Sequence, residues 1–151
     1  SALRMSLFNF KFNYMRVGDG RHDCWGQAVR RKFLDELEPD FIRRNRFYMN
    51  SWPNYTPISH AGWHFSWLGD NDTVKEKVQS FSHAESNRPE LLEQIDVDQS
   101  LQEGRTWNRA APEQMTVVKF DAYFPKTIIN NKDQYQHYII DGEFPSALTL
   151  L

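Results

Sequence analysis

The sequence predicts an α/β fold in which a mixed sheet is flanked by helices. Two strand-like stretches, Ala2–Tyr14 and Ile58–Gly69, alternate between residue types in the way typical of strands with distinct faces. Several other stretches repeat apolar residues at a spacing of three or four, as helices that pack on a sheet do. The length of 151 residues predicts a single domain, residues 1–151, that is large enough for a core of its own.

Composition excludes several classes of function. Lys and Arg number 18 against 20 Asp and Glu, so a formal net charge of −2 gives no electrostatic basis for binding nucleic acid or an anionic membrane. No apolar run in the sequence is long enough to span a bilayer. Cys24 is the only cysteine, which excludes an internal disulfide and a cysteine-based zinc site. The aromatic share of 15% suits either a core of large rings or a cleft that stacks on sugars.

The stretch ALRMSLFNFKFNY (Ala2–Tyr14) is predicted to be a central strand. Its apolar parity changes between Leu7 and Phe8, which predicts either a bulge or a strand that is buried on both faces at that point. A domain seldom opens on a central strand without a preceding turn. We therefore expect the chain to be a fragment of a longer protein.

The stretch ISHAGWHFSWLG (Ile58–Gly69) is the one around which a site is predicted. Its alternate residues form an apolar set and a small or polar set: Ala61, Trp63, Phe65 and Trp67 against His60, Gly62, His64 and Ser66. On a strand, this pattern puts both histidines on one face, beside the notch left by Gly62. We expect Trp63, Phe65 and Trp67 to be buried and His64 to reach a cleft. The simpler interpretation is a strand whose polar face meets solvent.

Helices are predicted where apolar residues recur with helical spacing. The first covers Gln27–Glu38, and Pro39 ends it or opens a shorter one. The second is capped by Asp70, Asn71 or Asp72, because these side chains accept hydrogen bonds from the first free amides of a helix. The buried stripe of this helix is predicted to be Val74, Val78 and Phe81. The same rules predict a third helix that starts at Asn87-Arg-Pro89 and a fourth that is capped by Asp98 and ended by Gly104. Thr116–Tyr123 is predicted to be extended.

Histidines and a carboxylate cluster around the second helix. His60 and His64 precede it, and His83 and Glu85 follow it. Brought together, imidazoles and a carboxylate can bind a transition metal or act as acid and base. A helix C-cap is an equal explanation for His83. Arg88 either pairs with Glu85 or contacts a substrate phosphate.

Asp96-Val-Asp98 has the spacing of an Asp-x-Asp metal motif. It lies between two amphipathic helices, where Asp is an ordinary cap. We therefore interpret the two aspartates as helix-end residues that are away from His64 and not as metal ligands.

The segment Ala61-Gly-Trp-His-Phe-Ser-Trp67, followed by a helix and Ser80-Phe-Ser-His83, resembles glycosyltransferase family 17. That family contains the enzyme that adds the bisecting β-1,4-linked N-acetylglucosamine to N-glycans. Leu3-Arg-Met-Ser-Leu-Phe-Asn-Phe10 is similar to the family strand that follows an acidic metal-binding motif. Phe124-Pro-Lys-Thr-Ile-Ile-Asn130 is similar to a late family segment.

The resemblance implies the C-terminal, acceptor-side part of a GT-A glycosyltransferase fold. It implies inverting transfer of an N-acetylglucosamine-like sugar from a nucleotide-sugar donor to a carbohydrate acceptor. A divalent cation, manganese or magnesium, would neutralise the leaving diphosphate, with its main acidic ligands outside this chain. We expect the chain alone to be inactive, and to self-associate through open strand edges at Leu3–Phe12 or to need the missing N-terminal half. The implied compartment is the cytoplasm for a bacterial or viral protein, with the Golgi lumen as the alternative.

The resemblance also implies roles for particular residues. Glu85 is the candidate base, with His83 beside it as the second candidate catalytic residue. His64 is the candidate metal ligand or diphosphate contact. The remaining predicted substrate-binding residues are His60, Arg88 and Trp107.

Two other functions stay open. A non-catalytic carbohydrate-binding domain would expose a row of aromatic side chains, which a transferase half would bury. A small metal hydrolase would need His60, His64 and His83 close to one point.

Overall fold

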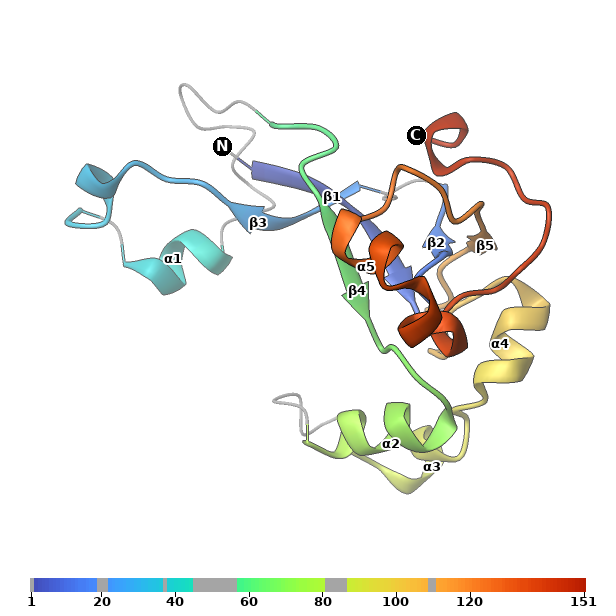
Figure 1. Ribbon diagram of the computed structural model, residues 1–151. Helices are drawn as coiled ribbons and strands as arrows, with labels where there is room; N and C mark the ends of the chain where they lie inside the picture. Colours follow the sequence, from blue (N-terminus) through green and yellow to red (C-terminus); the bar gives the residue numbers. More distant parts are fainter. Residues whose placement is uncertain (1, 19–21, 37, 45–56, 81–86, 109–110) are drawn as a thin grey trace. The chain divides into compact units, whose positions relative to one another are not determined.

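The computed structural model describes residues 2–18, 22–36, 38–44, 57–80, 87–108 and 111–151 (Figure 1). The chain divides into two compact units. Unit 1 is Ser1–Leu7 with His22–His64, and unit 2 is Phe8–Arg21 with Phe65–Leu151. Each unit is therefore built from two separate stretches of sequence.

The fold combines helices with an open, mainly antiparallel sheet. Strand β1 (Ala2–Asn9) pairs antiparallel with β2 (Tyr14–Arg16) and β3 (His22–Gln27). Strand β2 pairs antiparallel with β5 (Met115–Val117), and β4 (Trp63–Ser66) pairs with β1. The predicted combination of a sheet with helices is confirmed at this level, but the expected mixed sheet is not, because β1–β2, β1–β3 and β2–β5 all pair antiparallel.

Strand β1 is an interior strand, because β2, β3 and β4 all pair with it. Within unit 1, the amides of Arg4 and Ser6 donate to the carbonyls of Ile58 and Gly62, at 2.9 and 3.1 Å. The open strand edge expected at residues 3–12 is therefore absent within β1, whose described residues pair with other strands, and self-association itself stays a prediction. Leu7 and Phe8 are both buried, so the alternative of a strand buried on both faces is the correct one. The register shift against β3 lies elsewhere, between Leu3 and Arg4.

Unit 1 contains less helix than predicted. Gln27 ends strand β3, and the described part of the region predicted as the helix 27–38 (residues 27–36 and 38) contains only the 3₁₀ turn η1 (Arg31–Phe33). A short helix, α1 (Pro39–Arg44), then opens on its proline, as one of the two alternatives for Pro39 predicted. Val29, which a helix here would bury, is instead 36% exposed, and a helix owes most of its stability to packing of its apolar face.

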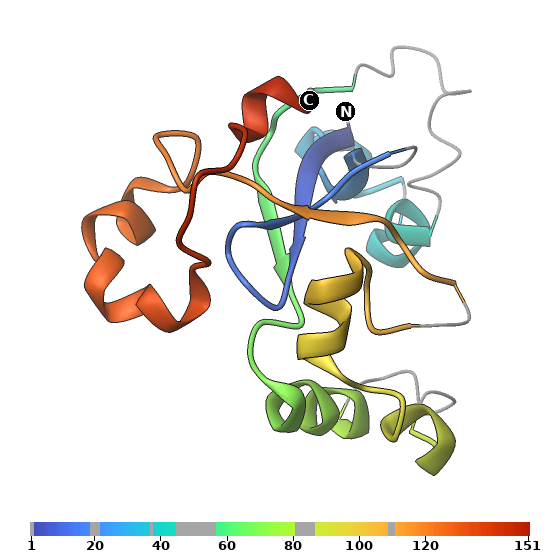
Figure 2. The ribbon, with the colours of Figure 1, turned by 90° about the vertical axis from the view of Figure 1, so that its right-hand side faces the viewer.

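The helices of unit 2 agree better with the sequence. They are α2 (Asn71–Ser80), α3 (Pro89–Leu92), α4 (Val97–Glu103), α5 (Lys126–Asn130), η4 (Lys132–Tyr138) and η5 (Ala147–Thr149). Val74 and Val78 are fully buried on α2 as predicted, and Phe81 lies outside the described residues. Gly104 ends α4 with a φ of 66°, a conformation that favours glycine. Figure 2 shows α2, α3 and α4 together at one end of the strands of unit 2, with α5 and η4 to one side.

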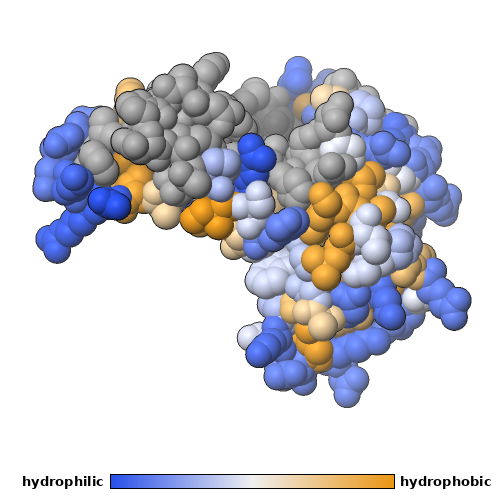
Figure 3. Space-filling view, turned by 90° about the horizontal axis from the view of Figure 1, so that it is seen from above, coloured by the Kyte–Doolittle hydropathy of each residue, from blue (hydrophilic) through white to orange (hydrophobic). Residues whose placement is uncertain are grey.

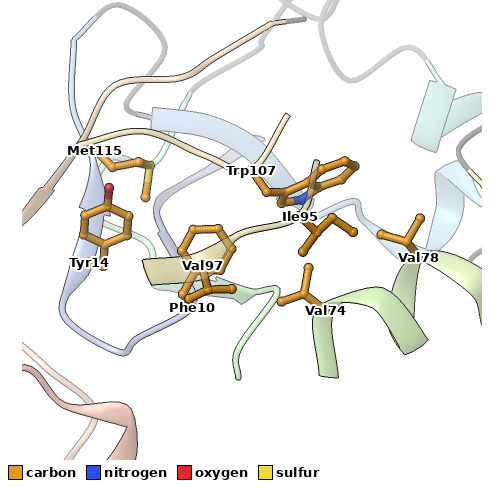
Figure 4. Packing of buried hydrophobic residues seen from close by; sticks show 8 residues of the cluster. All are labelled: Phe10, Tyr14, Val74, Val78, Ile95, Val97, Trp107 and Met115. Carbon is orange, nitrogen blue, oxygen red and sulfur yellow. The ribbon is translucent and has the colours of Figure 1, made fainter. Parts of the chain in front are cut away.

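Two groups of buried side chains form the core of unit 2. The first group, shown in Figure 4, is Phe10, Tyr14, Val74, Val78, Ile95, Val97, Trp107 and Met115. The second is Phe8, Met15, Val118, Phe124 and Ala147. Burying one large apolar side chain contributes about 1.5–3 kcal/mol, so these groups are the main source of stability in unit 2. No helix of the described residues is long and apolar enough to cross a membrane.

Candidate functional site

The predicted strand around His64 is shorter than the sequence pattern suggested. Strand β4 covers only Trp63–Ser66. The backbone leaves the extended conformation on both sides, with φ of 52° at His60, 154° at Gly62 and 54° at Trp67. In the sequence, apolar and polar residues alternate beyond both ends of β4. In the structure, the side chains there do not point regularly to opposite faces, because the backbone is no longer extended.

Backbone strain is concentrated at these two ends. Among the described residues, the non-glycine positions with positive φ are Phe10, His60 and Trp67. Positive φ is uncommon outside glycine, and a bulky residue such as Trp is an outlier there. Each such residue costs about 1–3 kcal/mol and persists only where the surroundings hold it. Two of the three strained positions thus bracket His64.

The side chains of this segment have mixed environments. His64, Phe65 and Trp67 are half-buried, but Trp63 is 36% exposed, so its predicted burial is wrong. The reason is that Trp63 opens β4 in unit 1, whereas the large buried clusters belong to unit 2. In unit 2, Phe65 packs on the rings of Phe8 and Phe12, with centroids 5.3 and 5.0 Å apart.

Trp107, predicted to bind substrate, lies in the first core group with only 9% exposure. Its ring makes an edge contact with Trp67, with centroids 5.4 Å apart. Trp67 also faces a cation, because Nζ of Lys77 lies 4.9 Å from its ring centroid. Partial burial lowers the pKa of this lysine. This arrangement places Trp107 in packing and leaves little of its face for a sugar.

The other predicted site residues lie on separate elements or outside the described residues. His60 is exposed in the turn before β4. Arg88 is exposed at the start of α3, where its carbonyl accepts hydrogen bonds from the amides of Leu91 and Leu92. His83 and Glu85, the predicted catalytic pair, lie outside the described residues. Their roles, and those of His60, His64 and Arg88, stay predictions.

A pocket that sequence analysis missed lies within unit 2, beside the first turn of α2. It has a volume of about 270 Å³ and is lined by Lys11, Gly69, Asp70, Asn71, Asp72, Val97 and Asp98. The sequence identified the three residues 70–72 as cap candidates but gave no signal for Lys11, which comes from the distant turn after β1.

Capping hydrogen bonds fix the walls of this pocket. Oδ1 of Asp70 accepts from the amide and the hydroxyl of Thr73, at 3.0 and 2.7 Å. These bonds, with a smaller contribution from the charge of Lys11, hold the pKa of Asp70 below its usual range. Oδ1 of Asn71 accepts from the amide of Val97 at 2.7 Å and so joins the starts of α2 and α4.

The Asp-x-Asp pair is part of the same helix starts. Oδ1 of Asp96 accepts from the amide of Gln99 at 2.9 Å and caps α4. The predicted cap, Asp98, is instead in the first turn, where its side chain lines the pocket. The prediction that both aspartates lie at a helix end is confirmed, with Asp96 rather than Asp98 as the cap.

The pocket is lined by side chains with oxygen acceptors, and one lysine, Lys11, adds a positive charge. Carboxylates and amides accept hydrogen bonds from ligand hydroxyls. Nζ of Lys11 donates to the carbonyl of His137 at 2.8 Å, which holds the lysine in place. In the part of the chain that the structure describes, no three His, Cys, Asp or Glu side chains are grouped to hold a metal ion. The aspartates and the asparagine of this pocket can therefore accept hydrogen bonds from ligand hydroxyls.

Comparisons with known protein families, with curated proteins and with solved structures find no match to this chain.

Proposed function

We propose that this chain is glycosyltransferase-like and supplies the acceptor side of an inverting sugar transfer from a nucleotide-sugar donor to a carbohydrate. The sugar transferred is of the N-acetylglucosamine type. One observation supports this proposal most directly: the strained backbone at His60 and Trp67, which brackets the segment that carries the family resemblance.

Strain of this kind is informative because it has a cost. Each of the two positions costs about 1–3 kcal/mol and persists only because the surrounding structure holds it. Residues held in sparsely populated conformations cluster at ligand sites and active sites. We infer that the segment holds His64 in a fixed position because that position is used.

The proposed chemistry needs a base and a positioned acceptor. Glu85, with His83 beside it, takes the proton from the attacking hydroxyl as the new glycosidic bond forms on the face opposite the leaving group. His64 contacts the donor diphosphate or its cation, and His60 and Arg88 contact the substrates. The divalent ion would lower the activation free energy by neutralising charge on the leaving diphosphate. The described residues include no fitting site for it, so no step through the ion is assigned to them.

A carbohydrate-binding domain without catalysis is the second candidate. It would display aromatic faces to stack on sugars. Among the residues whose side chains the structure describes, which excludes Trp25 and Phe33, Phe41 and Trp63 are the aromatic side chains that are at least 36% exposed, and both are in unit 1. In unit 2 the rings of Phe8, Phe10, Phe12, Tyr14, Trp107 and Phe124 are buried. The burial of these rings favours the transferase, whereas the exposed ring of Trp63 is the observation that favours a carbohydrate-binding domain.

The two candidates are separated by an experiment with two readouts. Acceptor binding is measured by titrating oligosaccharides into the labelled chain and following amide chemical shifts. Transfer is measured by incubating the chain, and any longer product of its gene, with manganese and a panel of nucleotide sugars, and following nucleotide release and product mass. We expect the chain to bind a glycan, and the longer product to transfer sugar.

The matched variants are His64→Ala and His137→Ala. His137 is exposed on η4 in unit 2 and has no assigned role. We expect the first variant to lose transfer by at least tenfold and the second to keep it. Glycan binding without transfer by any product of the gene would favour the binding domain. Absence of both glycan binding and sugar transfer would contradict the proposal. Multiple turnover by the monomeric chain would contradict the part of the proposal that limits this chain to the acceptor side.

A further inference from the structure

Asn9, the last residue of β1, is a buried polar residue whose side-chain oxygen lacks a partner. The residue is 3% exposed, and its Oδ1 accepts no hydrogen bond from the part of the chain that the structure describes. Figure 3 shows hydrophilic residues, in blue, over much of the visible surface, where water can bond to their polar groups. A buried acceptor without a donor is costly and calls for an explanation. This oxygen therefore indicates a partner that the described residues do not supply.

A second buried asparagine, in the turn after β1, shows the contrast with a structural role. The amide nitrogen of Asn13 donates to two carbonyls, at 2.9 and 2.8 Å, and its oxygen accepts from the amide of Ile140 at 2.9 Å. The other buried unpartnered atoms among the described residues, Oε1 of Gln27 and Nε of Arg105, belong to residues that are only half-buried. Asn9 is thus the most enclosed residue with an unpartnered polar atom in this set.

Ser66, on the neighbouring strand β4, shares a face with Asn9. Strand β4 pairs with β1, and the ring centroids of Phe65 and Phe8 are 5.3 Å apart, so these two rings lie on one face. Successive residues of a strand point to opposite faces, which places Asn9 and Ser66 together on the other face. Ser66 is half-buried, and its hydroxyl can both donate and accept a hydrogen bond. The two residues combine an enclosed acceptor with a more accessible hydroxyl.

We propose that Asn9 and Ser66 bind a hydroxyl group of the carbohydrate acceptor, which donates a hydrogen bond to Oδ1 of Asn9. The identity of the ligand rests on the proposed function, because Ser66 belongs to the segment between His64 and the strained Trp67 on which that function depends. Both binding residues belong to unit 2. In the chain without acceptor, a water molecule occupies the position of the sugar hydroxyl.

The chemistry of the two side chains selects a neutral ligand group. Oδ1 of an asparagine only accepts, so the ligand must carry a donor, which excludes a carboxylate. An ammonium group carries donors, but a neutral amide and a neutral hydroxyl offer no opposite charge to a cation that leaves water. A hydroxyl group satisfies both conditions. A sugar also carries neighbouring hydroxyls, and one of these can bond to the hydroxyl of Ser66.

The first test follows the side chain of Asn9 in the full, isotope-labelled chain by nuclear magnetic resonance. N-acetylglucosamine and methyl mannoside are titrated separately into the millimolar range. We expect the side-chain amide resonances of Asn9 to shift saturably and its nuclear Overhauser contact with water to disappear, while the exposed Asn131 stays unchanged. A water contact that persists at every concentration of both sugars would show a structural water only and would overturn the proposal.

Variants separate sugar binding from a structural role. Asn9→Leu removes the acceptor at similar volume, and we expect it to weaken sugar binding at least tenfold and to keep or raise the thermal midpoint, because a buried acceptor is lost. Ser66→Ala, at a less enclosed position, should weaken binding at least threefold, and Asn131→Leu should leave it unchanged. Asn13→Leu is the structural reference and should lower the midpoint. An equal fall of the midpoint in Asn9→Leu would overturn the proposal.

The outcomes also separate this inference from the proposed function. Sugar binding that Asn9→Leu and Ser66→Ala leave unchanged would overturn the site and leave the proposed transfer standing. Sugar binding that depends on Asn9, without transfer by any product of the gene, would support the site and favour the carbohydrate-binding domain over the transferase.

Discussion

The two units differ in what they do with their apolar residues. Both large buried clusters belong to unit 2. In unit 1, the buried hydrophobic residues among those whose side chains the structure describes are Ala2, Leu7 and Ile42. Five of the six large apolar residues that are exposed also belong to unit 1: Val29, Leu34, Phe41, Ile58 and Trp63. Apolar content alone therefore says little about stability, since the same residue types form a core in one unit and a surface in the other.

Unit 2 also joins distant segments by buried hydrogen bonds. The fully buried amide of Asn13 donates to the carbonyls of Val118 and Ile140 at 2.9 and 2.8 Å, and its oxygen accepts from the amide of Ile140. A buried amide that loses such partners costs about 1–3 kcal/mol. These bonds fix the C-terminal segment on the strands of unit 2, which makes unit 2 the scaffold and unit 1 the unit that presents surface.

The largest expected effect tests this contrast directly. Phe124 is 2% exposed, and its ring lies 5.3 Å from that of Phe8 and 4.8 Å from that of Phe120, between centroids. Phe124→Ala should lower the free energy of unfolding by about 3–5 kcal/mol, because it leaves a cavity in a packed cluster. Leu34→Ala in unit 1 should change it by at most about 0.5 kcal/mol. Urea denaturation measures both, and equal losses would remove the distinction between the units.

A second prediction concerns Tyr14, whose hydroxyl donates to the carbonyl of Ser100 at 2.7 Å inside unit 2. Burial raises the pKa of this phenol above its usual value. The unfolded chain therefore loses this proton at a lower pH than the folded chain does. The stabilisation is complete below the unfolded pKa of about 10 and declines as the pH rises above it.

Tyr14→Phe should cost about 1 kcal/mol near neutral pH, because the carbonyl of Ser100 loses its donor. It should also flatten the fall of stability above pH 10. Urea midpoints measured from pH 7 to 11 test both effects, and Tyr135→Phe controls for loss of a hydroxyl elsewhere in the unit. An alkaline slope that persists in Tyr14→Phe would assign the dependence to another group.

A smaller effect is expected at the start of α2. Asp70 caps this helix, and its pKa is lowered mainly by the hydrogen bonds from Thr73. Because the folded pKa is depressed, its contribution is present above the ordinary carboxyl pKa and is lost as the pH falls. Asp70→Ala should lower the thermal midpoint at pH 7 and reduce the shift of that midpoint between pH 7 and 3. Asp72→Ala, in the same turn, is the matched control and should have the smaller effect.

Local sequence signals explain why unit 2 was the more predictable unit. An acidic cap candidate and the stripe of Val74 and Val78 were enough to predict α2, because both signals come from residues within one or two turns of each other. The failed helix at 27–38 depended on a stripe being buried, and burial is decided by the rest of the molecule.

The candidate site was predictable only in part for the same reason. The alternation of residues 58–69 correctly indicated a strand at His64, but no pattern of residue types encodes the positive φ of His60 and Trp67. The pocket beside α2 needs Lys11 together with residues 69–72 and 97–98, which are brought together by the fold. Contacts of this range follow from packing and are invisible to local periodicity.

The smallest expected effect is at Asp96, where the two interpretations of Asp-x-Asp give opposite results. As a cap, its oxygen accepts from the amide of Gln99. Asparagine carries an equivalent acceptor, so Asp96→Asn should change the free energy of unfolding by only a few tenths of a kcal/mol, while Asp96→Ala should cost about 1 kcal/mol.

The same pair of variants tests for a metal. A ligand carboxylate would make folding stability depend on manganese, since an ion that binds only the folded state raises its stability. Thermal midpoints with and without the ion should be equal in wild type and in both variants. If manganese instead raised the midpoint of wild type but not of Asp96→Asn, unit 2 would hold a cation site in addition to its core, and its role as a scaffold alone would be wrong.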